Sequence, residues 1–166
     1  MLSEAACELF LEQGYEATSV SDITRRAGVS RSSFFNYFSA KSDVLWSGFD
    51  AQADAAIVRL REGQAVGACL AGIGTGLAPD ALALAITNAD AMGISTELDR
   101  DRALRQFRLQ RDLSARFMRD GESELAAQVR AGAFSAAVLA AVWAWADRTA
   151  AGRPLAEVLE SALALA

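Results

Sequence analysis

The sequence predicts an all-α protein, and three observations support this class. Apolar residues recur every three to four positions through most of the 166-residue chain, which is the spacing of one helix face. Alanine is abundant and only two prolines are present, so few positions interrupt a helix. An apolar fraction of 52% with 22% charged residues favours a chain that folds around a core.

The first predicted helix covers residues 1–13 and ends at Gly14, which is suited to a C-cap. A second short helix follows Ser19, because Ser19 and Asp22 have the spacing of a capping box. Gly28 ends this helix, since the turn that follows needs a backbone that tolerates positive φ.

The third predicted helix begins after Ser30, a residue suited to its N-cap, and continues to about residue 37. Phe34 and Phe38 lie four positions apart and supply its buried side. The residues left outside are Arg31, Ser32, Phe35 and Asn36. A short helix that exposes an arginine, hydroxyls and an aromatic ring suits the major groove of DNA, where base edges offer acceptors and a thymine methyl group. The pattern therefore predicts a helix-turn-helix.

The residues predicted to contact double-stranded DNA lie along this motif. Arg31 is the expected base reader, with Ser32, Phe35 and Ser21 beside it. Hydroxyl and ammonium groups at the helix ends are expected to hold phosphates or to cap helices. The complete predicted set is Ser19, Ser21, Ser30, Arg31, Ser32, Ser33, Phe35, Asn36, Tyr37 and Lys41.

The run Gly28-Val29-Ser30, followed by Ser33-Phe34-Phe35-x-Tyr37-Phe38-x-x-Lys41, resembles the signature of the TetR family of bacterial repressors. The preceding ACELFLEQGYEATSVSDI is similar to that family's first helix and its approach to the second, so the resemblance covers about the first fifty residues. The longer run FFNYFSAKSDVLW resembles the subgroup related to the mycofactocin-system regulator. Proteins of this family usually have a longer basic segment before the first helix. Here that arm is absent, or the form is truncated.

The resemblance implies a homodimeric, ligand-responsive regulator, most often a repressor, that binds palindromic operator DNA. Its helix-turn-helix head corresponds to residues 1–45, and its ligand-binding and dimerisation body to residues 46–166. The resemblance also implies a lipophilic small-molecule effector, and the subgroup likeness suggests an acyl-CoA. The predicted lining is apolar and consists of Trp46, Phe49, Met92, Phe107 and Trp143. For each of these side chains, ordinary core packing is the alternative.

Helical spacing predicts six helices in the body, for about nine in the whole chain. Their approximate bounds are 39–61, 64–73, 79–92, 97–119, 122–149 and a last helix from Pro154. Glycines cluster between residues 63 and 76, where they allow helices to approach closely or leave room for a ligand. Arginines alternate with acids in 97–119, which predicts a solvated face with internal ion pairs; inward-turned arginines near an anionic ligand are the alternative.

The last two predicted helices are more apolar than one small bundle needs to hide. In TetR-like proteins these helices of each subunit build a four-helix dimer interface, and the pattern here fits that arrangement. The residues predicted for the interface are Phe134, Val138, Val142, Trp145, Leu155, Val158, Leu159 and Leu163.

Charge and composition limit the other classes of function. The net charge is −5, but residues 14–41 carry four basic and two acidic side chains, which predicts modest, salt-sensitive DNA binding. The absence of histidine removes the usual general base and the common zinc ligand sets. We expect no catalysis, metal or cofactor. Cys7 and Cys69 are expected to be buried thiols, and no membrane span or targeting segment is visible, which predicts a cytoplasmic protein.

Two alternatives to a DNA-binding regulator remain. One is a helical dimer whose head reads little or no DNA and which acts as a small-molecule binding or interaction protein, because the local basic excess is small and the arm is missing. The other is an all-α enzyme, which would need activity from a cavity without histidine.

Overall fold

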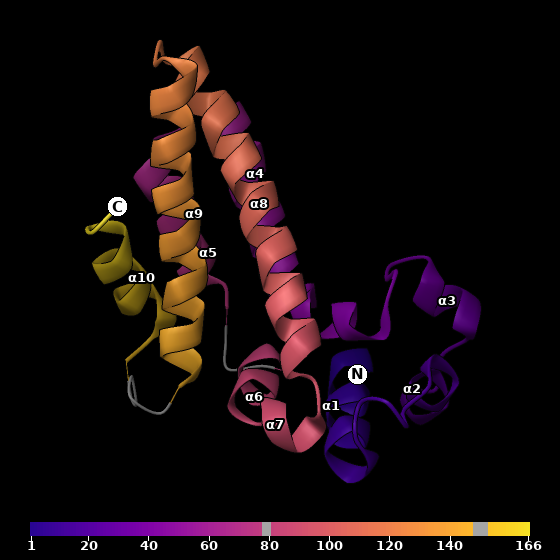
Figure 1. The fold of residues 1–166 in the computed structure, drawn as a ribbon. Helices are drawn as coiled ribbons and strands as arrows, with labels where there is room; N and C mark the ends of the chain where they lie inside the picture. Colours follow the sequence, from indigo (N-terminus) through magenta and orange to yellow (C-terminus); the bar gives the residue numbers. More distant parts are fainter. Residues whose placement is uncertain (78–80, 148–152) are drawn as a thin grey trace. The chain divides into compact units, whose positions relative to one another are not determined.

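The computed structural model describes residues 1–77, 81–147 and 153–166, and within these ranges its regular structure is entirely helical (Figure 1). This confirms the predicted class. The elements are α1 (Leu2–Gln13), α2 (Val20–Ala27), α3 (Arg31–Phe35), the 3-10 helix η1 (Lys41–Trp46), α4 (Ser47–Arg61), α5 (Val66–Thr75), α6 (Ala81–Thr87), α7 (Ala89–Met92), α8 (Ser95–Arg119), α9 (Glu124–Ala146) and α10 (Leu155–Leu163).

Two helices differ from the expected pattern for local reasons. The helix expected from residue 39 starts as η1, where the Asp43 carboxylate accepts from the backbone N–H groups of residues 39 and 40 at 3.0 and 2.9 Å. The helix expected over 79–92 divides at Asn88, whose side-chain amide donates to the Leu84 carbonyl at 2.8 Å and so competes with the helix backbone. The predicted starting position Pro79 and the predicted end near Thr149 lie outside the described residues.

The chain forms two compact units, Met1–Gly48 with Pro79–Asp101 and Phe49–Ala78 with Arg102–Ala166. In the first unit α1 packs against α2, η1, α6 and α7. Its fully buried side chains include Phe10, Ile23, Phe34, Trp46 and Met92. The first unit therefore holds residues 79–101 in addition to the 1–45 segment expected as the head.

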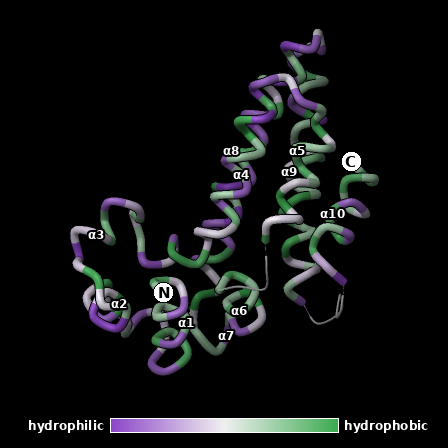
Figure 2. Tube along the Cα trace, turned by 180° about the vertical axis from the view of Figure 1, so that it is seen from behind, coloured by the Kyte–Doolittle hydropathy of each residue, from purple (hydrophilic) through white to green (hydrophobic). Residues whose placement is uncertain are grey.

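The second unit is built from α4, α5, α8, α9 and α10. α9 packs along α10, and α10 also packs on α5 (Figure 1). A Cβ atom at Gly74 of α5 would lie 2.8 Å from the Ala156 Cα of α10, so here a glycine permits the close approach. α9 is apolar over most of its length (Figure 2). Among the described helices it alone is long and apolar enough to cross a membrane, a property that core helices of soluble proteins share.

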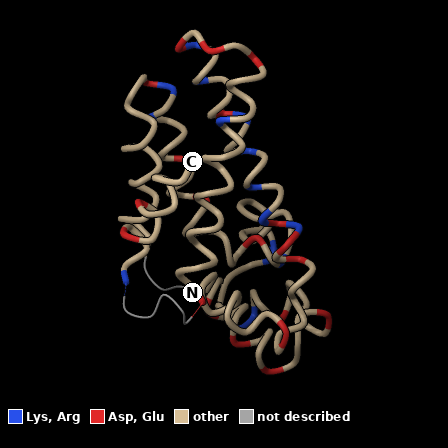
Figure 3. The backbone as a smooth tube through the Cα atoms, turned by 60° about the vertical axis from the view of Figure 1, so that its left-hand side comes forward, with Lys and Arg blue, Asp and Glu red and all other residues tan. Residues whose placement is uncertain are grey.

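Ion pairs join α4 to α8 within the second unit. Figure 3 shows the positions of the basic and acidic residues along the backbone. The least exposed of these ion pairs is the bidentate pair of Arg105 with Asp50. Two guanidinium nitrogens of Arg105 donate to the two carboxylate oxygens of Asp50 at 2.8 and 2.7 Å, and the arginine side chain is 12% exposed. Arg108–Asp54 and Arg61–Asp112 are further ion pairs between the same two helices. The charges of α8 thus pair with charges of α4, whereas the sequence predicted a solvated face with ion pairs inside the 97–119 segment.

Arg116 of α8 caps the C-terminal end of α4. Its guanidinium donates to the carbonyls of Leu60, Gly63 and Gln64 at 3.1, 3.3 and 2.6 Å. The last carbonyls of a helix have no partner within that helix, so a cation at this position satisfies them and interacts well with the helix dipole.

Candidate DNA-binding interface

α2 is fixed at both ends by the contacts its sequence predicts. The Ser19 hydroxyl accepts from the Asp22 backbone N–H at 3.1 Å, and the Asp22 carboxylate accepts from the Ser19 backbone N–H at 3.0 Å, which completes a capping box. Gly28 takes a left-handed conformation with φ 70° and closes the helix. The fully buried Ile23 holds the helix against the first unit's core.

α3 follows the turn and is anchored on its inner side by one buried aromatic side chain. Ser30 caps it, because its hydroxyl accepts from the Ser33 backbone N–H at 3.1 Å. Phe34 is fully buried, and its ring centre lies 5.3 Å from those of Phe35 and Phe38. The regular helix has only five residues, so this cap and this buried ring set the direction of the side chains on its outer side.

The outer side of α3 has the chemistry that the sequence predicted for it. Arg31, Ser32, Ser33 and Asn36 are exposed, and Phe35 and Tyr37 remain 51% and 82% exposed. The Arg31 guanidinium carbon lies 5.9 Å from the centre of the Phe35 ring. A guanidinium can donate two hydrogen bonds to guanine, and an aromatic ring can contact a thymine methyl group.

Most cations near this face already have partners. Arg25 pairs with Asp22, and Arg26 of α2 pairs with Glu8 and Glu12 of α1 at 3.1 and 2.8 Å. Arg31, by contrast, has neither a carboxylate nor a carbonyl partner within residues 1–45, all of which the structure describes. This segment carries four basic and six acidic side chains, and Arg31 is the one arginine or lysine among them that no oxygen acceptor of the segment holds.

Contacts in α1 and α2 lower the pKa values of two carboxylates, Asp22 and Glu12. The hydrogen bonds from the Ser19 side chain and backbone lower the pKa of Asp22. The hydrogen bond from Arg26 lowers the pKa of Glu12. Both groups are therefore stabilised in their ionised form, Asp22 within α2 and Glu12 in the ion pair that joins α1 to α2.

Lys41 has a different environment from the one expected of a phosphate contact. Its ammonium donates to the carbonyls of Tyr15 and Thr18 at 2.6 and 3.0 Å, and lies 3.9 Å from the centre of the Tyr15 ring. The sequence could not indicate this, because the acceptors are backbone atoms 23 and 26 residues away. The remaining predicted DNA contacts, Ser19 and Ser21 among them, lie at exposed or half-buried positions.

The five residues predicted to line a ligand site have three different environments. Trp46, Phe49 and Met92 are buried, with at most 1% of their surface exposed. Trp143 is half-buried, and the Arg102 guanidinium carbon lies 4.4 Å from its ring centre. Phe107 is 65% exposed on the outer side of α8, which corrects the expectation that it lines an enclosed site. A cavity shared by the other four stays a prediction.

The predicted dimer residues require a larger correction. Five of them are buried inside the second unit, because α10 covers one side of α9 and is itself packed on α5. These five are Val138, Val142, Leu155, Val158 and Leu159, none more than 9% exposed. In the single chain these side chains are packed inside the subunit. Phe134, Trp145 and Leu163 are half-buried.

The exposed apolar surface of α9 lies on its opposite side. Leu125 and Val129 are 76% and 68% exposed, and the alanines at 133, 136, 140 and 144 continue this line at half-buried or exposed positions. Their spacing of three to four residues is the signal that could have identified them. We call this line the α9 outer face.

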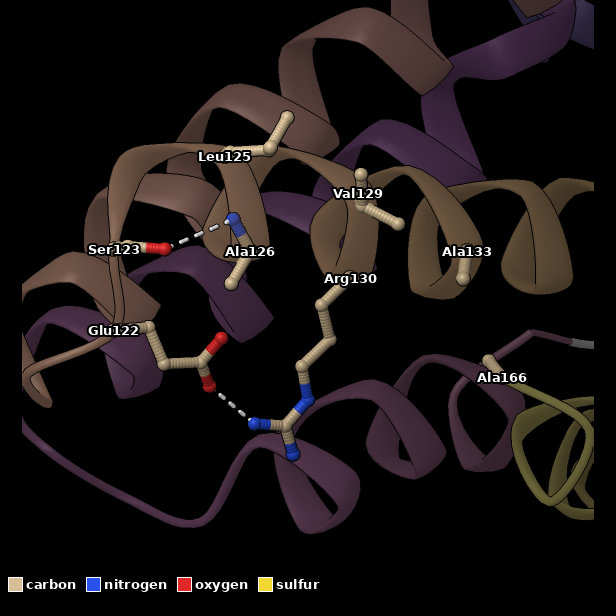
Figure 4. A pocket seen from close by; sticks show the side chains of 8 residues that line it. All are labelled: Glu122, Ser123, Leu125, Ala126, Val129, Arg130, Ala133 and Ala166. Atoms are coloured by element: carbon tan, nitrogen blue, oxygen red, sulfur yellow. Dashed lines mark hydrogen bonds and ion pairs between the residues drawn. The ribbon is translucent and has the colours of Figure 1, made fainter.

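An open groove of about 540 Å³ begins on the α9 outer face (Figure 4). It is lined by Glu122, Ser123, Leu125, Ala126, Val129, Arg130, Ala133 and Ala166. In the close view Leu125, Val129 and Ala133 follow one another along α9, and the ion pair of Arg130 with Glu122 lies at one side. This is an apolar surface with one paired cation at its edge.

Residues 2–45 match the family described as bacterial regulatory proteins, tetR family. The N-terminal segment of this chain is therefore similar to the tetR family. Over 48 residues the chain is 40% identical to a protein of Mycobacterium tuberculosis named as the mycofactocin biosynthesis transcriptional regulator MftR. That stretch is 29% of this chain and 24% of the relative, so the sequence likeness covers less than a third of either protein. Both the family and this relative are regulatory proteins, not enzymes.

Solved structures extend the likeness in fold to the whole chain. A TetR-family transcriptional regulator from Syntrophomonas wolfei is 19% identical, with a TM-score of 0.58 over 99% of this chain and 90% of that one. The transcriptional regulator FadR from Bacillus subtilis, in complex with stearoyl-CoA, is 22% identical, with a TM-score of 0.53 over 99% of this chain and 95% of that one. At these identities the comparisons establish the tetR-type fold.

Proposed function

We propose that this chain is a ligand-responsive transcriptional repressor that binds palindromic operator DNA as a homodimer. The observation that carries the proposal is the outer side of α3, where Arg31, Ser32, Phe35 and Asn36 are exposed on a helix fixed by a cap and a buried ring. Arg31 reads bases, and the hydroxyl and phenol groups around it meet phosphates.

The dimer forms through the α9 outer face. Leu125 and Val129 are large apolar side chains left exposed, and the alanines beyond them allow a second helix to approach closely. A two-fold dimer presents two α3 helices to one DNA, and successive major grooves on one side of a duplex are about 34–36 Å apart. The operator is therefore an inverted repeat whose half-sites are about one helical turn apart.

The effector is a lipophilic small molecule, with an acyl-CoA as the first candidate. The support for this class is the likeness in fold to FadR of Bacillus subtilis, whose structure contains stearoyl-CoA. A bound effector changes DNA affinity only if it prefers one of two conformations of the protein, here the one whose heads do not fit the operator.

The direct test uses the promoter region of the gene that encodes this chain. We expect the purified protein to bind this fragment at low salt, and long-chain acyl-CoA to release it. The small molecules that co-purify with the protein are identified by mass spectrometry, and we expect a lipophilic compound among them. Absence of binding at low salt by the full-length protein contradicts the proposal.

A second candidate is a tetR-type dimer that binds a small molecule or a partner protein without reading DNA. The charge of the head favours it, since residues 1–45 have six acidic against four basic side chains and two of the cations are held by acids. The two candidates separate on the promoter fragment. The second one predicts no sequence preference at any salt concentration, with the dimer and effector binding intact.

A further inference from the structure

The Lys41 ammonium lies in an environment of acceptors and an aromatic face. It donates to two carbonyls at 2.6 and 3.0 Å and lies 3.9 Å from the ring centre of Tyr15. An ammonium has three N–H donors, so two are used by carbonyls and the ring faces the same cation. Lys41 is thus the most fully engaged of the basic residues that the sequence suggested for DNA.

Tyr15 is a rigid partner for this ammonium. The residue is 7% exposed, its backbone N–H donates to the Met92 carbonyl at 2.8 Å, and its ring meets that of Phe10 edge-on at 5.1 Å. Burial raises the pKa of the Tyr15 phenol, and a hydrogen bond with Ser42 acts in the opposite direction. The acceptors of Lys41 therefore belong to a part of the first unit that is held from several sides.

The two carbonyls also mark the segment that leads into α2. Within that segment the Thr18 hydroxyl donates to the Gly14 carbonyl at 2.8 Å, and Ser19 then caps α2. Lys41 opens η1, just after the segment that carries α3. Its ammonium consequently joins the chain before α2 to the chain after α3 and closes the base of the helix-turn-helix.

We propose that Lys41 is a positioning residue that clamps the base of the helix-turn-helix and so fixes the orientation of α3, and that it does not neutralise a DNA phosphate. This inference rests on the proposed DNA-binding function for its effect on affinity. The clamp itself is a property of the free protein. The two parts can therefore be tested separately.

The first experiment measures the salt dependence of binding to a mixed-sequence duplex by fluorescence anisotropy, for the wild type and Lys41→Met. A lost phosphate contact makes the slope of log affinity against log salt shallower by about 0.9 for each subunit. A lost clamp weakens binding by about tenfold at every salt concentration, because hydrogen bonds to a charged group are lost, and leaves the slope unchanged. Arg31→Met, which removes an exposed cation, is the control that changes the slope.

The second experiment measures amide hydrogen exchange in the free protein, with no DNA present. We expect Lys41→Met to accelerate exchange of the amides of residues 15–20 by about tenfold or more, since opening this loop no longer breaks the clamp. Arg25→Met, an exposed cation that pairs with Asp22, is the matched control and leaves the amides of residues 15–18, which Asp22 does not contact, unchanged. If Lys41→Met does not fold by circular dichroism, Lys41→Gln replaces it, because its amide can still donate one hydrogen bond.

The two experiments distinguish a clamp from a phosphate contact. An unchanged salt slope with faster exchange at residues 15–20 supports the clamp. A slope that becomes shallower by about 0.9 per subunit overturns it, and so does unchanged exchange at these amides. If the wild type binds no DNA even at low salt, the proposed function fails, and the exchange experiment still decides the clamp.

Discussion

Two exposed surfaces of this molecule differ in almost every respect. α3 is a regular helix of five residues, and its outer side exposes Arg31, hydroxyl groups and an aromatic ring. The α9 outer face belongs to a helix of 23 residues and exposes Leu125, Val129 and alanines. α3 is held by a cap and a buried ring, whereas α9 is held by α10 along its opposite side.

The difference shows that exposure alone does not identify a function. A polar, hydrogen-bonding surface loses little when it stays in water, and it gains specificity against base edges. A contiguous apolar surface is costly in water and gains by meeting another apolar surface. The two surfaces should therefore respond independently to mutation, one in DNA recognition and the other in assembly.

Arg31→Ala should have the largest effect. Each bidentate contact to a base contributes about 1–3 kcal/mol of discrimination, and a dimer makes two, so we expect about a 100-fold loss of affinity for the preferred operator. Affinity for unrelated DNA should fall much less. Fluorescence anisotropy with both duplexes measures the ratio, and the dimer mass should be unchanged. An unaltered ratio would remove Arg31 from base recognition.

Val129→Glu should have the next largest effect, on assembly. A carboxylate placed in an apolar interface without a partner costs about 3 kcal/mol, which corresponds to roughly a 100-fold weaker dimer. Sedimentation equilibrium measures this change, and circular dichroism should show a folded subunit. Val58→Glu, on an exposed position of α4, is the matched control with an unchanged dimer. Equal dissociation of both variants would place the interface elsewhere.

Gly74→Ala tests the buried contact between α5 and α10 rather than either exposed surface. The new Cβ would lie 2.8 Å from the Ala156 Cα, so α5 and α10 must separate, and we expect a loss of about 2 kcal/mol in the free energy of unfolding. Urea denaturation measures it. Gly67→Ala, in the same helix with nothing within 4 Å, should be neutral or stabilise by up to about 1 kcal/mol. Similar behaviour of the two variants would contradict the close approach.

Acid should have the smallest effect on the support of α3. The folded pKa values of Asp22 and Glu12 are lowered, so their stabilising contribution is present above their unfolded pKa values of 3.8 and 4.5 and is lost as the pH falls below them. With no histidine in the chain, stability should change little between about pH 6 and 8. Asp22→Asn should flatten the acid limb of a thermal-unfolding series relative to Glu16→Gln, and an identical limb would contradict this assignment.

The helix-turn-helix could be predicted because its signals are local. Ser19 and Asp22 cap α2, Gly28 ends it, and Ser30 caps α3, each through contacts within a few residues. The family resemblance of the first fifty residues agrees with the match over 2–45. Local patterns of this kind require no knowledge of the tertiary fold.

The remaining features depend on contacts between distant segments. Periodicity showed that α9 is apolar, but only the packing of α10 on it decides that Val138 is covered and Val129 is not. Phe107 matched an apolar pattern and yet is exposed, and Lys41 meets carbonyls far away in the sequence. A hydrophobic pattern indicates a face, and the fold decides which neighbour covers it.

Selection of binding sites from a random DNA pool tests the central claim most directly. The purified wild type should enrich an inverted repeat with half-sites about one helical turn apart, and Arg31→Ala should lose preference at one base position in each half-site. Enrichment of the same repeat by both proteins, or no enrichment by the wild type at low salt, would contradict recognition of DNA through α3.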